Sequence, residues 1–380
     1  MSPIALVLVL LVSLSPTAPV AHVPPETPGA PETPGATTAP AAHAAPAAPA
    51  AAVASLPGVA MAAAVDAPLP RRPVATYSIV ARDSTTGELG VAVQSHWFSV
   101  GGLVPWAESG VGAVATQSFV DPRYGPLGLE LMRLGRSAPQ ALAALTATDE
   151  GAAVRQVAMV DATGRVAVHT GERCIDAAGH HPGSQYSVQA NLMESPTVWD
   201  AMARAYETTS GDLAERLLAA LDAAEQEGGD IRGRQSAAIL VVVGTPTGRP
   251  WHDRLYDLRV EDHPDPVREL RRLVTLRRAY RQLEEGDEAI AAGDVDAALE
   301  AYHSALELVP DEATNGEAAF WVGVTLAATG RLPEARPYLR RAFLQDERWL
   351  ETAGRLPPAG LLPDDPVLLR QIIDAMQEAR

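Results

Sequence analysis

The sequence of 380 residues contains no lysine and only one cysteine, Cys174. A Schiff-base lysine, a P-loop lysine and an internal disulfide are therefore excluded. No run of apolar residues reaches the roughly 18 that a membrane-spanning helix needs. Cations are scarce relative to anions, and the formal net charge is −17. Because this negative field repels phosphate backbones, we expect no nucleic-acid partner.

Common catalytic signatures are also missing. The sequence has no G-x-S-x-G, Walker, H-E-x-x-H or C-x-x-C motif. The segment 110–115 resembles a dinucleotide fingerprint, but β-branched residues and Pro122 follow where a helix should begin. One group of potential metal ligands lies close in sequence: His169, Cys174, His180 and His181. Their spacing matches no known type of zinc site. We expect neither a metal nor a cofactor.

The first 75 residues hold 15 of the 32 prolines and repeat the hexapeptide PETPGA at 25–30 and 31–36. Such a composition predicts a disordered Pro/Ala-rich linker over 22–75. A short apolar stretch at 4–12 precedes it and suits the core of a secretory signal within 1–21, although no basic residue precedes that stretch. We expect export to the periplasm or the extracellular space. A cytoplasmic location is the alternative if the start codon is assigned too far upstream.

From Thr76 onward the sequence alternates between strand and helix patterns. Turn signals at 83–87 and 161–164 lie between apolar stretches and predict two hairpins. The predicted strands are 77–81, 89–93, 110–115, 156–160, 166–170, 188–190 and 237–243. The predicted helices are 126–134, 138–145, 195–208 and 212–227. This order predicts an α+β domain, with sheets enclosed between helical layers, over 76–262.

The remaining segment, 263–380, has helical spacing throughout. Gly293, Ala298, Tyr302 and Ala305 have counterparts 37 positions later in Gly330, Ala335, Leu339 and Ala342. A self-similar helix-turn-helix unit of this length is of the tetratricopeptide type. The segment is therefore predicted to be an all-α repeat domain, which is a common platform for protein partners.

The segment 229–236 is the part of the sequence richest in candidate binding residues. Asp230, Arg232 and Gln235 lie on a glycine-hinged loop that enters a buried strand. Charged groups beside a buried strand need partners. Arg232 could bind a ligand carboxylate, or it could pair internally with Asp230 and fix the loop. The residues alone leave both alternatives open.

Six motifs in order resemble the bacterial domain-of-unknown-function family numbered 1028, which is grouped with the N-terminal-nucleophile (Ntn) hydrolases. They are TYSIVARD (76–83), GVGAVATQ (110–117), YGPLGL (124–129), AGH (178–180), YSVQ (186–189) and GDIRGRQSA (229–237). The resemblance covers about half of the chain and implies an αββα sandwich. It also implies amide-bond hydrolysis of a small or cell-wall-derived substrate, and a helical appendage of the kind described as peptidoglycan-binding.

The resemblance gives Thr76 a catalytic role. In Ntn hydrolases the hydroxyl of the first residue attacks a carbonyl while its own α-amine acts as the base. A protease would have to cut after Ala75 to expose that amine. Asn191 and Gln117 are then the candidate oxyanion donors, and Asp230, Arg232, Gln235 and His180 are the candidate substrate-binding residues. We expect these residues to form one pocket, with the chain before Thr76 exposed.

Two classes of function remain after this reasoning. The first is an Ntn-type amidohydrolase with a helical partner module. The alternative is a non-catalytic binding or scaffold protein on the same fold, with peptidoglycan or a protein as its partner. The sequence does not decide between a monomer and a homo-oligomer.

Overall fold

The structure is a computed structural model that describes residues 75–378. The predicted signal-like segment 1–21, and all of the predicted linker 22–75 except Ala75, lie outside the described residues.

Two antiparallel sheets form the first part of the described chain. The larger has the strand order β10-β9-β2-β1-β8-β7 and the smaller has the order β3-β4-β5-β6. The strands of the larger sheet are β1 Thr76–Arg82, β2 Leu89–Ser95, β7 Gly179–Gly183, β8 Tyr186–Asn191, β9 Ser236–Val242 and β10 Arg254–Val260. Those of the smaller sheet are β3 Pro105–Glu108, β4 Gly112–Ser118, β5 Arg155–Asp161 and β6 Val166–Thr170.

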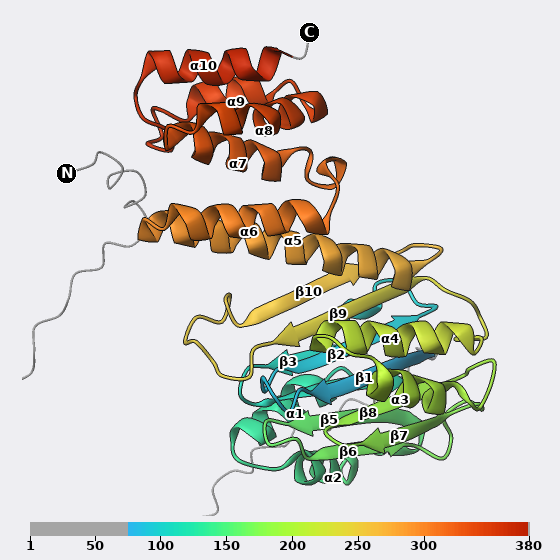
Figure 1. Ribbon diagram of the computed structural model, residues 1–380. Helices are drawn as coiled ribbons and strands as arrows, with labels where there is room; N and C mark the ends of the chain where they lie inside the picture. The colour runs from blue at the N-terminus through green and yellow to red at the C-terminus, as the bar shows by residue number, and fades with distance from the viewer. Residues whose placement is uncertain (1–74, 379–380) are drawn as a thin grey trace, which may run out of the picture. The chain divides into compact units, whose positions relative to one another are not determined.

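Helices cover the outer face of each sheet (Figure 1). Helices α3 Val198–Thr208 and α4 Leu213–Gln226 pack on the larger sheet, while α1 Tyr124–Arg133 and α2 Ala138–Thr146 pack on the smaller one. Along each central strand the side chains alternate between the helical layer and the opposite sheet, as the pleat requires. On β1, Ile79 packs with α3 and α4, whereas Val80 packs between the sheets. The predicted αββα sandwich is confirmed.

Three strands were not predicted. β3 and β10 are edge strands, and β7 has the sequence Gly-His-His-Pro-Gly, in which no residue favours a strand. β7 forms because its backbone pairs with β8, from Gly179 opposite Ala190 to Gly183 opposite Tyr186. Its two histidines point in opposite directions, as expected for a strand. His180 meets Thr170 of β6, and His181 meets Asp200 of α3.

The rest of the described chain is helical. Its helices are α5 Pro266–Ala292, α6 Val295–Leu308, α7 Glu317–Ala328, α8 Leu332–Gln345, α9 Trp349–Arg355 and α10 Pro366–Gln377. The predicted 37-residue offset matches the pairs α5–α6 and α7–α8. Gly293 and Gly330, which follow the first helix of each pair, both have φ of +80°. The predicted all-α region is confirmed.

Helix α5 belongs to two hydrophobic cores. Val267, Leu270 and Val274 pack with α4 and the larger sheet, while Ala279 and Leu283 pack with α6 and α7. The predicted domain boundary, between residues 262 and 263, lies just before this helix, but both cores extend into it.

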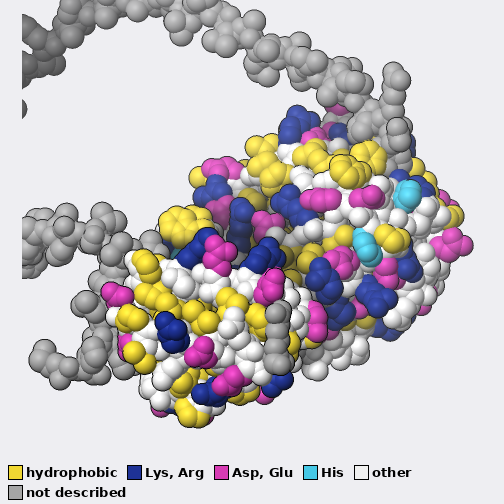
Figure 2. Space-filling view, turned by 90° about the horizontal axis from the view of Figure 1, so that it is seen from above, with side chains coloured by type: hydrophobic (Ala, Val, Ile, Leu, Met, Phe, Trp, Pro, Cys, Tyr) yellow, Lys and Arg dark blue, Asp and Glu magenta, His cyan; other side chains and the backbone are white. Residues whose placement is uncertain are grey.

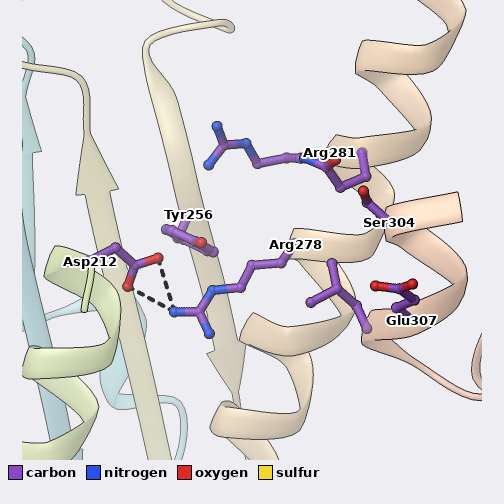
Figure 3. Close-up of a pocket in the computed structure, with 8 residues that line it drawn as sticks. Asp212, Tyr256, Arg278, Arg281, Ser304 and Glu307 are labelled. Carbon is purple, nitrogen blue, oxygen red and sulfur yellow. Dashed lines mark hydrogen bonds and ion pairs between the residues drawn. The ribbon is translucent and has the colours of Figure 1, made fainter. Parts of the chain in front are cut away.

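The arginines of α5 have two kinds of partner. Arg271 pairs with Glu215 and Asp222 of α4, and Arg278 donates to Asp212 at the start of α4 over 2.8 and 3.0 Å (Figure 3). Others on the same helix pair locally, as Arg272 does with Glu269. The arginines of α5 therefore both hold the helix against α4 and form ion pairs on its solvent-exposed face.

Within residues 75–378, no helix is both long and apolar enough to cross a membrane. On the face of the molecule seen in Figure 2, acidic and basic side chains are interspersed among exposed hydrophobic ones.

Candidate functional site

The inward-facing side chains of the two sheets change from apolar to polar toward one end of the sandwich. On β4, for example, Ala113 and Ala115 face the opposite sheet with the apolar core, and Gln117 follows them. We call eight of the completely buried polar side chains at this end the polar layer: Thr76, Ser78, Ser95, Gln117, Gln156, Ser187, Gln189 and Asn191. Because burial of a polar group is costly unless it is hydrogen-bonded, such a layer must be internally paired.

Gln156 is the hub of the polar layer. Its Oε1 accepts from Gln117 Nε2 over 2.7 Å and from Asn191 Nδ2 over 2.9 Å. Its Nε2 donates to Thr170 Oγ1 and to the carbonyls of Gly179 and Ala190 over 2.9 to 3.1 Å. One side chain of β5 thereby ties together strands from both sheets.

The two predicted oxyanion donors hold the backbone of Thr76. Gln117 Nε2 lies 3.1 Å and Asn191 Nδ2 lies 3.4 Å from the Thr76 carbonyl oxygen. Since both amides also donate to Gln156, their N–H groups are occupied within the protein. In this arrangement the amides of Gln117 and Asn191 position Thr76. That they donate hydrogen bonds to the oxyanion of a substrate stays a prediction. Asn191 Oδ1 is buried and accepts no hydrogen bond from the described residues.

The Thr76 hydroxyl meets its cross-strand neighbour, Ser95. The Thr76 Oγ1 atom lies 3.2 Å from Ser95 Oγ, which in turn donates to the carbonyl oxygen of Ala75. The same carbonyl accepts from an Arg232 Nη2 atom 3.0 Å away. Two donors, one of them cationic, thus converge on the carbonyl that directly precedes Thr76. This is the arrangement that stabilises an oxyanion.

Asp230 holds Arg232 in that place. Its carboxylate accepts from the Arg232 backbone N–H, from Nε and from Nη2 over 2.8 to 3.0 Å, and from the His96 backbone N–H over 3.0 Å. The loop can follow this path because Gly229 and Gly233 have φ of +61° and +105°. Of the two alternatives left open by the sequence, the internal Asp–Arg pair is present, and its guanidinium also reaches the chain next to Thr76.

Two further predicted residues lie differently. His180 joins the polar layer from its edge, since its Nδ1 lies 2.8 Å from Thr170 Oγ1, which is bonded to Gln156. Burial, together with the nearby His169 and His181, lowers the pKa of His180. Gln235 is not brought to Thr76, and its Nε2 lies 3.2 Å from Asp262 instead.

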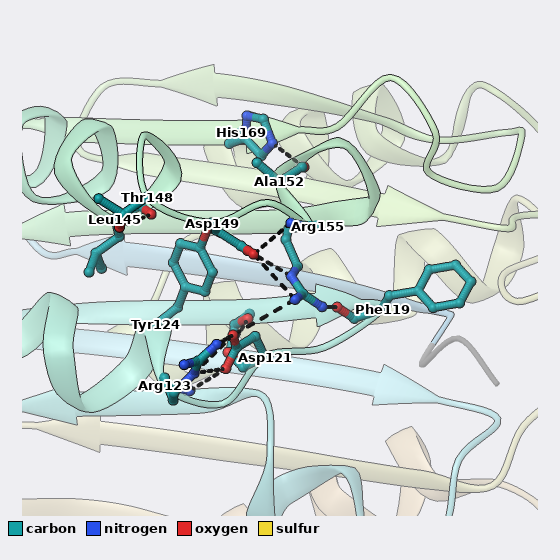
Figure 4. A network of polar contacts seen from close by, with 12 residues as sticks. Phe119, Asp121, Arg123, Tyr124, Leu145, Thr148, Asp149, Ala152, Arg155 and His169 are labelled. Atoms are coloured by element: carbon teal, nitrogen blue, oxygen red, sulfur yellow. Dashed lines mark hydrogen bonds and ion pairs between the residues drawn. The ribbon is translucent and has the colours of Figure 1, made fainter. Parts of the chain in front are cut away.

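An arginine of β5 braces the strand ends beside the polar layer. Arg155 precedes Gln156, donates to the Phe119 carbonyl over 2.5 Å and pairs with Asp149 over 2.8 Å (Figure 4). Burial opposes the charge of Asp149, but the Arg155 guanidinium and nearby N–H and O–H donors hold the pKa of that carboxyl below its usual value. This network fixes the segment that follows β4, directly after Ser118.

The expectation that the chain before Thr76 is exposed is wrong for the residue next to it. Ala75 has no accessible surface, and its carbonyl is bound by Ser95 and Arg232. The bond between Ala75 and Thr76 is therefore out of reach of an external protease in this form of the chain.

Sequence reasoning missed most of the polar layer. Ser95, Gln156 and Gln189 are polar residues at inward positions of their strands. That period-2 pattern was readable, but it does not say that the three strands meet at one end of a sandwich. No group of three or more potential metal ligands occurs among residues 75–378.

The fold and this site define a class of protein, an αββα sandwich with a threonine at the start of a central strand and a helical-repeat region after it. The model of DUF1028, a family of unknown function, matches residues 76–270. Since that is more than half of the 380 residues, the chain belongs to this family. A tetratricopeptide-repeat model matches residues 289–351.

One solved structure illustrates the similarity. The crystal structure of protein SPO2555 from Silicibacter pomeroyi, also described as DUF1028, has 32% sequence identity. The match covers 57% of this chain and 88% of that one, with a TM-score of 0.48. No curated protein matches the chain. None of these comparisons supports peptidoglycan binding by the helical region.

Proposed function

We propose that this protein is an amidohydrolase in which Thr76 is the nucleophile, active once the chain has been cut between Ala75 and Thr76. The observation that carries the proposal is the pair of donors, Ser95 and Arg232, on the carbonyl next to the Thr76 hydroxyl. A carbonyl placed there is polarised, and a tetrahedral oxyanion would be stabilised by the same two groups.

In the proposed reaction the Thr76 hydroxyl oxygen attacks the substrate carbonyl carbon, and its proton passes to the free α-amine of Thr76. The amide C–N bond then breaks as the leaving nitrogen takes that proton. Water hydrolyses the resulting ester and restores the threonine. Gln117 and Asn191 hold the Thr76 carbonyl, so the new N-terminus would keep its position after the cut.

The substrate class is a small amide, and a cell-wall-derived peptide is our candidate. This choice rests on the proposed export of the chain, which places it in the periplasm or outside the cell.

Turnover by a chain that begins at Thr76 tests the proposal. We expect it to hydrolyse an amide in a panel of small peptides, and the same chain with the residues before Thr76 retained to be inactive. Thr76→Ala should abolish the rate, and Thr76→Ser should retain part of it. Thr208→Ala, an exposed threonine on α3, is the matched control and should leave the rate unchanged. A Thr76→Ala chain that folds and keeps its rate would refute the nucleophile.

A non-catalytic function is the second candidate, and the burial of Ala75 favours it. If the chain is never cut, the α-amine of Thr76 stays in an amide bond and no base is formed. Intact-mass analysis of protein from the native host separates the two candidates. A mature chain that begins at Thr76 supports the enzyme, and one that retains Ala75 supports a binding or scaffold role.

The helical region suggests a protein partner under either function, because tetratricopeptide repeats are a recurrent platform for protein–protein interaction. Its partner would then bring the sandwich domain to its place of action.

A further inference from the structure

A hollow, separate from the polar layer, opens where helix α5 leaves the sandwich. It has a volume of about 520 Å³, within the range of small-ligand pockets. Asp212 at the start of α4, Tyr256 of β10, Arg278 and Arg281 of α5, and Ser304 and Glu307 of α6 line it (Figure 3). No residue of the polar layer contributes to the hollow, so an inference about it does not depend on the proposed function.

Two of its four charges neutralise each other. Arg278 donates to both carboxylate oxygens of Asp212, and its Nη1 lies 3.5 Å from Glu215. This pair joins α5 to α4 and is part of the fold. It leaves one cation and one anion, Arg281 and Glu307, to face the hollow.

Arg281 and Glu307 have no ion pair within the described part of the chain, where pairs are counted to 4.0 Å. Arg281 does act at longer range on Glu88, whose pKa is raised by burial and lowered in part by this guanidinium. Figure 3 shows Arg281 and Glu307 reaching from different helices, α5 and α6. The hollow therefore offers separate positive and negative ends.

Tyr256 of β10 forms part of the wall of the hollow. Its side chain is almost completely buried, and its hydroxyl makes no hydrogen bond of good geometry with the described residues, although Arg278 lies near it. The Tyr256 ring and Leu308 supply apolar surface in the same hollow.

We propose that this hollow binds a small zwitterion with both an ammonium and a carboxylate group, such as a dipeptide. The carboxylate would bind the Arg281 guanidinium, and the ammonium group would bind Glu307. An anion alone would leave Glu307 unpaired beside it, and a cation alone would leave Arg281 unpaired. The neutral sum of the lining charges selects a neutral ligand with separated charges.

Ligand-observed NMR titration of the full chain tests the proposal, and the same spectra reveal any cleavage of the peptide. The probes are L-alanyl-L-alanine, its N-acetyl derivative, which lacks the ammonium group, and its C-terminal amide, which lacks the carboxylate. We expect saturable binding of the dipeptide, and each blocked peptide to bind about tenfold more weakly or worse.

Two variants identify the ends of the site. In Arg281→Gln the dipeptide should bind about tenfold more weakly, and the C-terminal amide should no longer be at a disadvantage. In Glu307→Gln the dipeptide should also bind about tenfold more weakly, and the N-acetyl peptide should no longer bind more weakly than the dipeptide. Arg268→Gln and Glu300→Gln change exposed residues of the same two helices outside the hollow and should leave binding unchanged.

A variant that is merely less stable would bind all three peptides more weakly. It would not lose the difference in affinity between the dipeptide and one blocked peptide. Absence of saturable binding at millimolar dipeptide would overturn the proposal. Equal binding of all three peptides would do so too, as would an Arg281→Gln chain that still discriminates against the amide.

Discussion

At the scale of single residues, the main feature of the site is the set of hydrogen bonds that fixes Thr76 and the carbonyl before it. Its carbonyl is bound by Gln117 and Asn191, its hydroxyl contacts Ser95, and the preceding carbonyl is bound by Ser95 and Arg232. These contacts leave the threonine a single position in the site. Such preorganisation is what a nucleophile needs, and it comes from residues on three different strands and one loop.

The hub of the polar layer should be worth several hydrogen bonds of stability. Gln156→Leu keeps the approximate volume but leaves Gln117, Asn191 and Thr170 without their shared partner. We expect the free energy of unfolding to fall by about 3 kcal/mol, since unsatisfied buried polar groups cost about 1–3 kcal/mol each. Urea unfolding measures this loss. Gln226→Leu, at an exposed position of α4, is the control and should stay within about 0.5 kcal/mol of the parent.

His180 should make stability depend on pH. Burial lowers its pKa in the folded chain, so the unfolded chain binds the proton more tightly and protonation favours unfolding. Its contribution to stability is present above its ordinary pKa of about 6.5 and is lost as the pH falls through that value toward the lower folded pKa.

We therefore expect the melting temperature of the parent to fall more between pH 7.5 and pH 5.5 than that of His180→Asn, in which Asn can still bond Thr170. If the melting temperatures of the two chains fall in parallel with pH, His180 has the same pKa in the folded and the unfolded chain, and the prediction is wrong.

At the scale of elements, most of the sandwich was predictable because its central strands and flanking helices have clear periodicity. The strand at Ser236–Val242 has an uninterrupted apolar run from residue 237 onward, and the helix at Ala138–Thr146 begins with the capping box of Ser137. β7 was not predictable, because its strand form comes from pairing with β8 and not from its own residues. The prediction that Gln235 lies in the Thr76 pocket is wrong, because the sequence of a loop does not determine the direction in which each side chain points.

The crossing of α5 and α6 depends on one glycine. A Cβ atom at Gly286 would lie 2.2 Å from Cε1 of Tyr302, whose hydroxyl is fixed by Asp287 over 2.7 Å. Gly286→Ala should therefore destabilise the helical region by about 1–3 kcal/mol, the usual cost of overpacking.

Gly354 of α9 is the matched control, because a Cβ atom there meets nothing within 4 Å. Gly354→Ala should stabilise the chain by about 0.5–1 kcal/mol through helix propensity. Thermal unfolding of the two variants should move in opposite directions, and a stabilising effect of Gly286→Ala would contradict the close packing of α5 on α6.

At the scale of the whole molecule, the site residues are spread along the chain from Thr76 to Arg232. The sequence could not show that they converge on one site. Their strands are joined by hairpins and crossovers whose order in the sheets is a property of the complete fold. Nor does the sequence show that one helix serves two cores. The periodicity of α5 is continuous from Pro266 to Ala292, so nothing in it marks where the sandwich ends and the repeats begin.

The two cores of α5 predict where the chain can be truncated. A chain that ends at residue 285 keeps Val267, Leu270 and Val274, which pack against the sandwich, and should remain soluble and unfold cooperatively. A chain that ends at residue 262 loses all three. Burial of such side chains contributes about 1.5–3 kcal/mol each, and the sum is comparable to the whole stability of a domain.

We expect the chain that ends at residue 262 to aggregate or to unfold at a much lower temperature, as light scattering and calorimetry would record. The polar layer lies outside the deleted parts in both chains, so Thr76 is present in each. If the chain that ends at residue 285 aggregates as well, the sandwich needs the repeats for its stability. If both chains fold equally well, the first turns of α5 contribute nothing to its core.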